Sequence, residues 1–211
     1  MRIVFQGDSI TDCGRDRRDS GSLGSGYVRE VLSRLPEDWA CFNRGVSGDR
    51  VYELEARWKQ DCLDLKPDVV TIMIGINDTW RRFDSRIESP ISEFEASLAR
   101  ICLSVVDTGA KLILMEPFLL PIPEDRMRWR EDLDPRIQAV RRVALDFAES
   151  LVPLDGFFAA AACRYGMAEL AEDGVHPTKL GHELIAKSLV PVIMNVVYPS
   201  QSAEINVASS I

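Results

Sequence analysis

Five short apolar runs recur along the chain, each followed by an amphipathic segment. The runs are Ile3–Gln6, Ala40–Asn43, Val69–Ile74, Lys111–Glu116 and Val152–Asp155. Apolar residues in continuous runs, as opposed to strict alternation, are typical of strands buried on both faces of a parallel sheet. The pattern therefore predicts five strands, and Pro153 places the last of them near an edge of the sheet.

Between the runs, apolar side chains recur every three or four positions, which is the period of an amphipathic helix. Such helices are expected over Tyr27–Leu35, Val51–Cys62, Phe94–Val105, Ile137–Phe147 and Leu180–Ile193. Asp49 is a candidate N-cap for the second helix, and Pro191 is expected to kink the last one. Five consecutive strand–helix units predict an α/β fold with a parallel sheet and helices on both of its faces.

The length of 211 residues suits one ordinary domain, which we expect over residues 1–198. Residues 199–211 form a short, polar, serine-rich segment, which is either a free tail or an arm that contacts another subunit. The glycine-rich stretch 21–26 resembles a phosphate-binding loop, but it lacks the Lys-Ser/Thr ending and does not follow a strand directly. We expect it to be a flexible loop.

Composition and charge exclude several classes of protein. With 46% hydrophobic and 27% charged residues, the chain is globular and not disordered. Its 33 acidic residues against 25 basic ones give a net charge of −8, which disfavours binding to nucleic acid. It contains no run of about 18 apolar residues, so we expect no membrane-spanning segment.

The N-terminus and the cysteines indicate a cytoplasmic protein. The apolar run after Met1 is too short for a signal peptide, so we expect the mature chain to begin there. The five cysteines are widely spaced, odd in number and form no CxxC pair, which is typical of reduced thiols. With only two histidines, His176 and His182, a zinc site is not expected, and no metal or other cofactor is predicted.

Candidate catalytic residues follow the predicted strands, where ligands bind in open parallel sheets. Ser9 comes after the first strand, and its hydroxyl is a candidate nucleophile, although most serines in turns only form local hydrogen bonds. Asp173 precedes His176 by three residues, and Pro177 favours an extended conformation for His176. The carboxylate can then meet one imidazole nitrogen and leave the other for a serine; the alternative is a surface pair without a catalytic role. His182 lies within the last helix and is expected to be non-catalytic.

Acyl transfer also needs hydrogen-bond donors for a developing oxyanion. The candidates are the backbone N–H groups of Ser9 and Gly45 and the side-chain amide of Asn77, which follows the third strand. Asn77 could equally belong to an Asn-Asp turn whose side chains bond locally. Trp80 and Arg81 follow closely and are candidates for binding a sugar, although both could instead pack or pair at the surface.

Four ordered segments carry a family resemblance. These are Gly7-Asp8-Ser9-Ile10, Gly45, Gly75-Ile76-Asn77-Asp78 and Asp173-Gly174-Val175-His176. Together they resemble the GDSL (SGNH) hydrolase superfamily over about residues 3 to 195, with Ile10 in place of the usual leucine. The resemblance implies a three-layer αβα, flavodoxin-like fold with a five-stranded sheet. It also implies Ser9 as nucleophile, Asp173 and His176 as the rest of a triad, and Ser9, Gly45 and Asn77 as oxyanion donors.

The longer runs Gly7–Arg15 and Gly75–Arg81 are similar to a branch containing intracellular bacterial acetylxylan esterases, whose members are cytoplasmic and tend to oligomerise. The sequence thus predicts a carboxylic ester hydrolase that removes small acyl groups, chiefly acetyl, from a small-molecule or oligosaccharide ester. A homo-oligomer is possible, and no nucleic-acid or membrane partner is expected. The alternatives are a lysophospholipase or thioesterase of the same fold, or a catalytically silent carbohydrate-binding protein.

Overall fold

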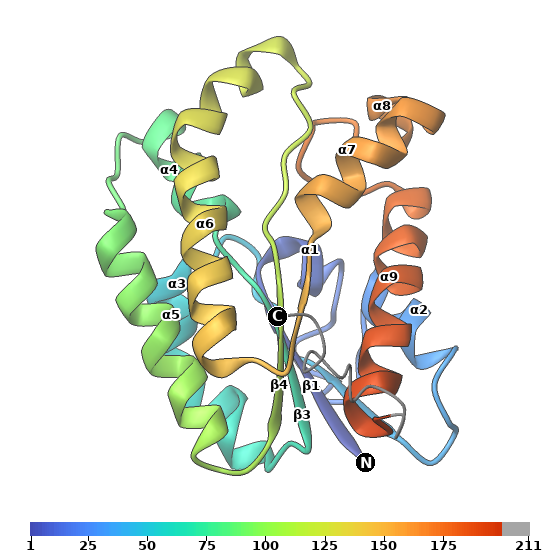
Figure 1. The fold of residues 1–211 in the computed structure, drawn as a ribbon. Coiled ribbons are helices and arrows are strands. Elements are labelled where there is room, and N and C mark those ends of the chain that lie inside the picture. The colour runs from blue at the N-terminus through green and yellow to red at the C-terminus, as the bar shows by residue number, and fades with distance from the viewer. Residues whose placement is uncertain (200–211) are drawn as a thin grey trace, which may run out of the picture.

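The computed structural model describes residues 1–199, which form a parallel sheet between two layers of helices (Figure 1). The strands are β1 (Arg2–Gly7), β2 (Ala40–Asn43), β3 (Val69–Met73), β4 (Lys111–Met115) and β5 (Ser150–Val152). The α-helices are α1 (Ser9–Asp12), α2 (Tyr27–Leu32), α3 (Val51–Asp61), α4 (Ile76–Asp84), α5 (Ile91–Val106), α6 (Arg130–Phe147), α7 (Leu154–Tyr165), α8 (Met167–Leu170) and α9 (Lys179–Val197). Two short 3-10 helices are η1 (Leu63–Leu65) and η2 (Glu124–Trp129).

The strand order is β2-β1-β3-β4-β5, and every neighbouring pair is parallel. This arrangement confirms the predicted α/β fold with a five-stranded parallel sheet, including the placement of the fifth strand at an edge. Because β1 lies between β2 and β3, its carboxyl end adjoins the loops that follow both neighbours. Phe5, for example, lies opposite Asn43 of β2 and Thr71 of β3.

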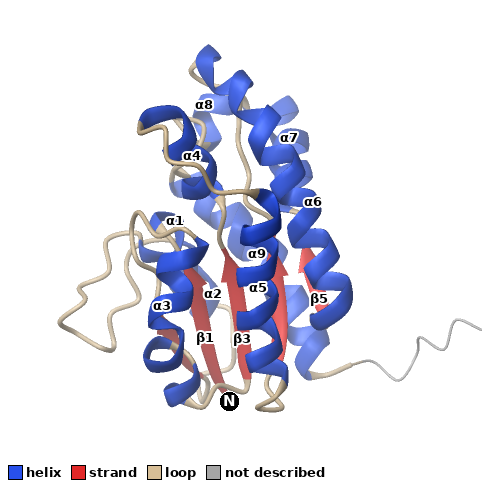
Figure 2. Cartoon of the chain, turned by 90° about the vertical axis from the view of Figure 1, so that its left-hand side faces the viewer, coloured by secondary structure: helices blue, strands red, loops and turns tan. Residues whose placement is uncertain are grey.

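Alternate side chains of the strands enter two separate hydrophobic cores, which explains the continuous apolar runs. Ile3 and Phe5 of β1 belong to the core under α2 and α9, whereas Val4 belongs to the core under α3, α5 and α6. All three side chains are fully buried. The helices cover both faces of the sheet, as Figure 2 shows in blue around the red strands.

Helix α9 has an unusually apolar sequence. It is the one helix of the described residues whose length and mean hydropathy of 1.3 would allow it to cross a membrane. Its side chains Ile185, Leu189 and Ile193 are fully buried in the core beside α2. Packing on the sheet therefore accounts for the apolar composition. Pro191 lies inside the helix, which continues beyond it to Val197.

The segment around Pro153 differs from the sequence prediction. A strand was expected over Val152–Asp155, but β5 ends at Val152 and α7 begins at Leu154. Proline lacks the N–H that a strand ladder uses, and its fixed φ suits the residue before a helix. The predicted strand therefore stops where the helix starts.

Two helix boundaries also differ. Asp49 is not the N-cap of α3, because that position belongs to Arg50, whose N–H donates to Glu53 at 3.0 Å. The Asp49 carboxylate accepts instead from Arg57 at 2.6 Å. The first predicted helix ends at Leu32, three residues before Leu35. The segment predicted as a tail lies, apart from its first residue, outside the described part of the chain.

Candidate active site

Ser9 lies just beyond the carboxyl end of β1, the strand between β2 and the central strand β3. It is the first residue of α1, directly after β1 and its N-cap residue Asp8. The Asp8 carboxylate accepts the N–H of Ile10 at 3.0 Å, which fixes the start of this short helix. Ser9 is only partly buried, so its hydroxyl remains accessible at this edge of the sheet.

Three side chains from opposite ends of the chain form one hydrogen-bonded series. The Ser9 Oγ lies 2.9 Å from His176 Nε2, and His176 Nδ1 lies 2.7 Å from Asp173 Oδ2. Because a carboxylate can only accept, Nδ1 carries the proton, and Nε2 of the neutral ring accepts from the serine hydroxyl. The structure thus brings together the three residues that the sequence analysis selected.

The loop that carries His176 is fixed by its own backbone. The second oxygen of Asp173 accepts the N–H groups of Val175 at 3.0 Å and His176 at 2.7 Å. Gly174, directly after Asp173, has φ +79°, and a Cβ on it would overlap the carbonyl oxygen of Leu120. The Leu120 N–H donates to the Gly174 carbonyl at 2.9 Å. The loop after β4 therefore holds the aspartate and the histidine in place.

The electrostatics suit a base that is poised to accept a proton. The hydrogen bond that His176 donates to Asp173 raises the pKa of the ring above its ordinary 6.5, although partial burial opposes the shift. Burial would raise the pKa of Asp173, but the bonds from His176 and from the backbone outweigh it and hold that pKa far below its usual range. Burial raises the pKa of the neighbouring Asp8 carboxyl to about 7. Its Oδ2 has no hydrogen-bond partner among the described residues.

Asn77 lies in the first turn of α4, which follows β3, the neighbour of β1 in the sheet. Its Nδ2 donates one hydrogen to the Asp49 carbonyl at 3.1 Å, which joins the loop after β2 to the loop after β3. An amide nitrogen has two hydrogens, so one remains for another acceptor. The alternative of an Asn-Asp turn does not apply, because these residues begin a helix whose N-cap is Gly75.

The prediction for Gly45 disagrees with the structure. Its N–H already donates to Asn43 Oδ1 at 2.9 Å, and a Cβ on Gly45 would overlap the backbone of α1. Close packing, and not a substrate, is the reason for a glycine there. Gly48, three residues later, has φ +89°, and no hydrogen bond from its N–H occurs within residues 1–199. It precedes Asp49, whose carbonyl accepts from Asn77.

Arg57 of α3 fastens these loops to the sheet. Its guanidinium donates to the carbonyl of Gly7 at 3.1 Å, to the carbonyl of Arg44 at 2.7 Å and to the Asp49 carboxylate at 2.6 Å. One side chain therefore joins the end of β1 to both ends of the loop that contains Gly48.

A second buried arginine fixes α4. Arg136 is fully buried and donates to Asp132 at 2.9 Å and to the Ser89 carbonyl at 3.0 Å. Ser89 in turn donates to the buried Asp78, the residue after Asn77, at 2.8 Å. Burial raises the pKa of Asp78 to about 6, against the lowering effect of Arg136. This network sets the position of Asn77.

The two candidate sugar-binding residues lie in different surroundings. The Trp80 ring lies 5.8 Å from the His176 ring and 5.1 Å from the ring of Trp129. Arg81 pairs with Asp84 at 3.1 Å, and its side chain is 39% exposed. Trp80 is therefore a neighbour of the Ser9–His176 pair, whereas Arg81 already has a carboxylate partner.

The second histidine has a structural environment, as expected. His182 Nδ1 accepts the N–H of Tyr27 at 3.1 Å, and its Nε2 lies 3.3 Å from Cys13 Sγ. Burial lowers its pKa to about 4, so the ring is neutral at physiological pH. Within residues 1–199 no group of His, Cys, Asp and Glu side chains is arranged to hold a metal ion.

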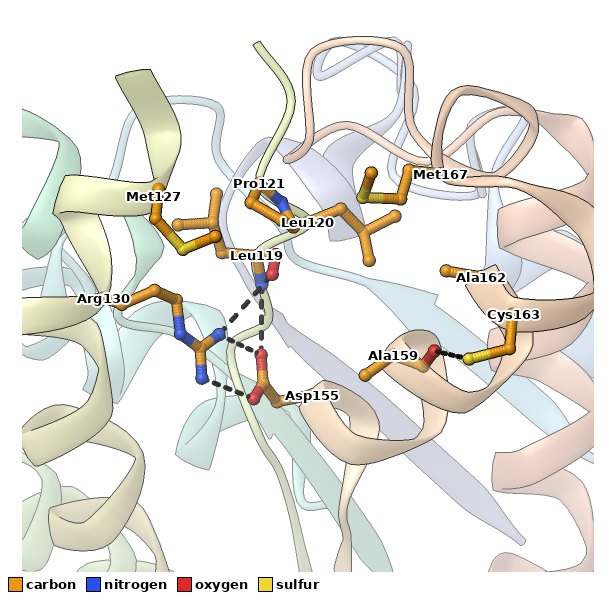
Figure 3. Close-up of a pocket in the computed structure, with 10 residues that line it drawn as sticks. All are labelled: Leu119, Leu120, Pro121, Met127, Arg130, Asp155, Ala159, Ala162, Cys163 and Met167. Carbon is orange, nitrogen blue, oxygen red and sulfur yellow. Dashed lines mark hydrogen bonds and ion pairs between the residues drawn. The ribbon is translucent and has the colours of Figure 1, made fainter. Parts of the chain in front are cut away.

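An apolar groove of about 440 Å³ lies between the loop after β4 and α7 (Figure 3). Leu119, Leu120, Met127 and Met167 line it, and a bidentate ion pair between Arg130 and Asp155, at 2.7 and 2.8 Å, closes one end. Ser9, Asn77 and His176 are not among its lining residues. The groove shares a wall with the histidine loop through Leu120.

The model of the GDSL-like Lipase/Acylhydrolase family matches residues 5–184. An acetylxylan esterase from Geobacillus stearothermophilus is 36% identical over 203 residues, which cover 90% of this chain and 92% of that protein.

Two solved structures are similar along most of their length. One is an acetylxylan esterase from Geobacillus stearothermophilus, in a catalytic mutant with serine replaced by alanine. It is 33% identical, the match covers 91% of this chain and 93% of that protein, and the TM-score is 0.81. The other is an alpha/beta hydrolase from the metagenome of Lake Arreo, with 36% identity, coverage of 90% and 93%, and a TM-score of 0.82.

Proposed function

The chain belongs to the GDSL-like lipase/acylhydrolase family, and we propose that it is a serine esterase that hydrolyses small acyl esters, chiefly acetyl esters, of carbohydrates. The observation that carries this proposal is the series of hydrogen bonds from Ser9 through His176 to Asp173, at 2.9 and 2.7 Å. A catalytic serine in the similar acetylxylan esterase supports it. A hydroxyl, an imidazole and a carboxylate in this order form an acyl-transfer triad.

The geometry suggests a two-step reaction. His176 Nε2 accepts the proton of Ser9 as the hydroxyl oxygen attacks the ester carbonyl. Asp173 fixes the tautomer of the ring and stabilises the imidazolium that forms. His176 then gives the proton to the leaving sugar oxygen, and an acyl group stays on Ser9. Water, deprotonated by the same ring, attacks this acyl-enzyme and releases the acid.

Three donors would stabilise the oxyanion of each tetrahedral intermediate. Two are the backbone N–H of Ser9, which has no acceptor among residues 1–199, and the second hydrogen of Asn77 Nδ2. The third is the N–H of Gly48 in place of Gly45, because only the Gly48 group is free of a partner in the described chain. Such preorganised donors act most strongly where charge develops in the transition state.

Replacing Asn77 with alanine is expected to lower kcat by about 10²- to 10³-fold, or about 3 kcal/mol of transition-state stabilisation. KM should change much less, because this donor bonds most strongly to the oxyanion. Steady-state kinetics with 4-nitrophenyl acetate measures both constants, and circular dichroism checks that the variant is folded. A large rise in KM with an unchanged kcat would make Asn77 a residue for ground-state binding.

The pH dependence of kcat/KM should report the pKa of His176. Only the neutral ring accepts the serine proton, so activity should rise with pH through a pKa that Asp173 raises above 6.5. In Asp173→Asn that partner charge is lost, so the midpoint should move to lower pH, while the plateau falls by about 10⁴-fold. A pH–rate profile of both proteins tests this. An unmoved midpoint would assign the titration to another group.

The relatives and the surroundings of His176 both favour a carbohydrate ester. The similar curated protein is an acetylxylan esterase, and Trp80 lies 5.8 Å from the imidazole ring. An indole can lie against the apolar face of a sugar. The competing function, hydrolysis of a lipid or thioester, needs space for a long acyl chain. The apolar groove beyond Leu120 is the observation that favours it.

A series of 4-nitrophenyl esters from two to twelve carbons separates these functions. We expect kcat/KM to be highest for acetate and to fall as the chain lengthens, because the described groove is lined by none of the reacting side chains. Acetate should also be released from acetylated xylo-oligosaccharides. A maximum at eight carbons or more, without acetate from any sugar, would favour the lipase or thioesterase.

We further propose that the protein acts in the cytoplasm. We also propose that it needs no cofactor, since the reaction as described uses only groups of the chain and water. Assembly into a homo-oligomer is compatible with the exposed apolar side chains beside the groove, such as Met127 and Met167. Light scattering of the purified protein measures its oligomeric state, and cell fractionation measures its compartment.

A further inference from the structure

A stacked guanidinium lies next to the histidine loop. Arg126 of η2 is partly buried, and its Cζ lies 3.8 Å from the ring centre of Trp129 and 4.7 Å from that of Trp80. Trp80 in turn lies 5.8 Å from the His176 ring. The two indoles and the guanidinium therefore form a continuous wall that begins at the catalytic imidazole.

The charge of Arg126 has no counterion within residues 1–199. Its only hydrogen bond there is a long one of 3.4 Å from Nε to the Asp173 carbonyl. By contrast, Arg82 of α4 and Arg130 of α6 pair with Asp132 and Asp155 at 2.8 and 2.7 Å. The two indoles stabilise the guanidinium through cation–π contacts but do not neutralise its charge, so Arg126 stands out as a group for an anionic ligand.

The acidic side chains around Arg126 do not supply this counterion. Glu124 and Asp125 of the same 3-10 helix are exposed and form no ion pair with it in the described chain. The carboxylate of Asp173 is occupied by the ring of His176 and by two backbone N–H groups. The guanidinium is therefore available to an anion from solution.

The geometry points to a carboxylate as that anion. Stacking on Trp129 fixes the plane of the guanidinium, and Nε faces the Asp173 carbonyl, which leaves the edge formed by the two Nη atoms free. Two parallel N–H groups in one plane match the two oxygens of a carboxylate. We propose that Arg126 binds the carboxylate of a uronic acid unit, so that the preferred substrates are acetyl esters of acidic sugars. This inference rests on the proposed function, because it places the sugar along Trp80.

A purely structural role for Arg126 makes a different prediction. If the guanidinium only holds Trp80 and the Asp173 loop, its loss should slow the hydrolysis of every ester to the same extent. If it binds a carboxylate, its loss should act on acidic substrates in particular. The ratio of kcat/KM for an acidic and a neutral substrate separates the two roles, because any common loss cancels.

The experiment compares mono-acetylated methyl xyloside with mono-acetylated methyl glucuronoside, whose rings differ by one carboxylate. The wild-type protein should prefer the glucuronoside, and the preference should fall with added salt. In Arg126→Gln the ratio should drop by about 10- to 100-fold, mainly through KM. Arg126→Lys should give an intermediate ratio, since lysine keeps the charge but lacks the two parallel N–H groups of the guanidinium. Arg128→Gln is the matched control, because Arg128 is exposed on the same helix.

A binding measurement keeps the outcome separate from the proposed esterase function. In the Ser9→Ala background, sodium glucuronate should quench tryptophan fluorescence, xylose should do so less, and Arg126→Gln should remove the difference. If glucuronate binding depends on Arg126 but the protein with Ser9 intact hydrolyses neither sugar ester, the carboxylate site is retained and the proposed substrate class is rejected. An unchanged ratio, or equal binding of glucuronate with and without Arg126, would overturn the proposal.

Discussion

Replacement of Ser9 by alanine is expected to lower the turnover of 4-nitrophenyl acetate by about 10⁴- to 10⁶-fold. The reason is that the Ser9 oxygen is the only hydroxyl bonded to His176 in the described structure, so no other group can form the acyl-enzyme. Stability should change little, because removing an accessible hydroxyl costs about 1 kcal/mol or less. Thermal unfolding of both proteins checks this second expectation.

Covalent labelling provides an independent measurement of the nucleophile. A fluorophosphonate should modify Ser9 in the wild-type protein and no residue in Ser9→Ala. Ser25→Ala is the matched control, because Ser25 lies in the loop after α1 and its hydroxyl bonds only to its neighbour Cys13. It should keep normal labelling and turnover. Labelling elsewhere, or near-normal activity of Ser9→Ala, would reject Ser9 as nucleophile.

Replacement of His176 by alanine should be about as damaging as loss of Ser9, again about 10⁴- to 10⁶-fold, because the two residues act as one unit. His182→Ala is the matched comparison. It removes the acceptor of the Tyr27 N–H, so stability should fall by about 1–3 kcal/mol. The folded fraction should nevertheless turn over substrate at a rate close to that of the wild-type protein. Kinetics at a temperature below both unfolding transitions separates the two effects.

The opposite result would assign the role of general base to His182 and not to His176. If His182→Ala, shown to be folded, lost activity while His176→Ala kept it, the base would lie in α9. The pKa of His182, lowered to about 4 by burial, argues against this. A base with so low a pKa is neutral at pH 7 but drives proton transfer weakly.

The sequence predicted the strands and most of the site for a common physical reason. Strands buried on both faces need continuous apolar runs, and the reactive groups follow those runs at the carboxyl ends, so order along the chain translates into position in space. Ser9, which directly follows β1, could be selected in this way, whereas His176 follows α8 and is selected through its spacing from Asp173. Their contact at 2.9 Å could not be predicted, because it depends on how the loop of His176 packs against the loop after β4.

The errors have local causes. Gly45 and Gly48 both follow β2, and the sequence does not show which of their N–H groups already has a hydrogen-bond acceptor. The hydrogen bond from the Gly45 N–H to Asn43 is visible only in the folded structure. At Pro153 the apolar run continues past the end of β5. The predicted strand 152–155 therefore includes residues that belong to α7. Arg126 and Trp129 gave no periodic signal in a short 3-10 helix.

The separation of Ser9 and His176 by 167 positions has a consequence for biosynthesis. Chains fold from the N-terminus as they leave the ribosome. Ser9 emerges with the first strand, but His176 follows only after the fifth, and non-local contacts of this kind are slow to form. A partly made chain therefore carries Ser9 without the imidazole that bonds to it in the complete fold. Ester hydrolysis is accordingly a property of the nearly complete polypeptide, and its appearance in time marks the docking of the last helix.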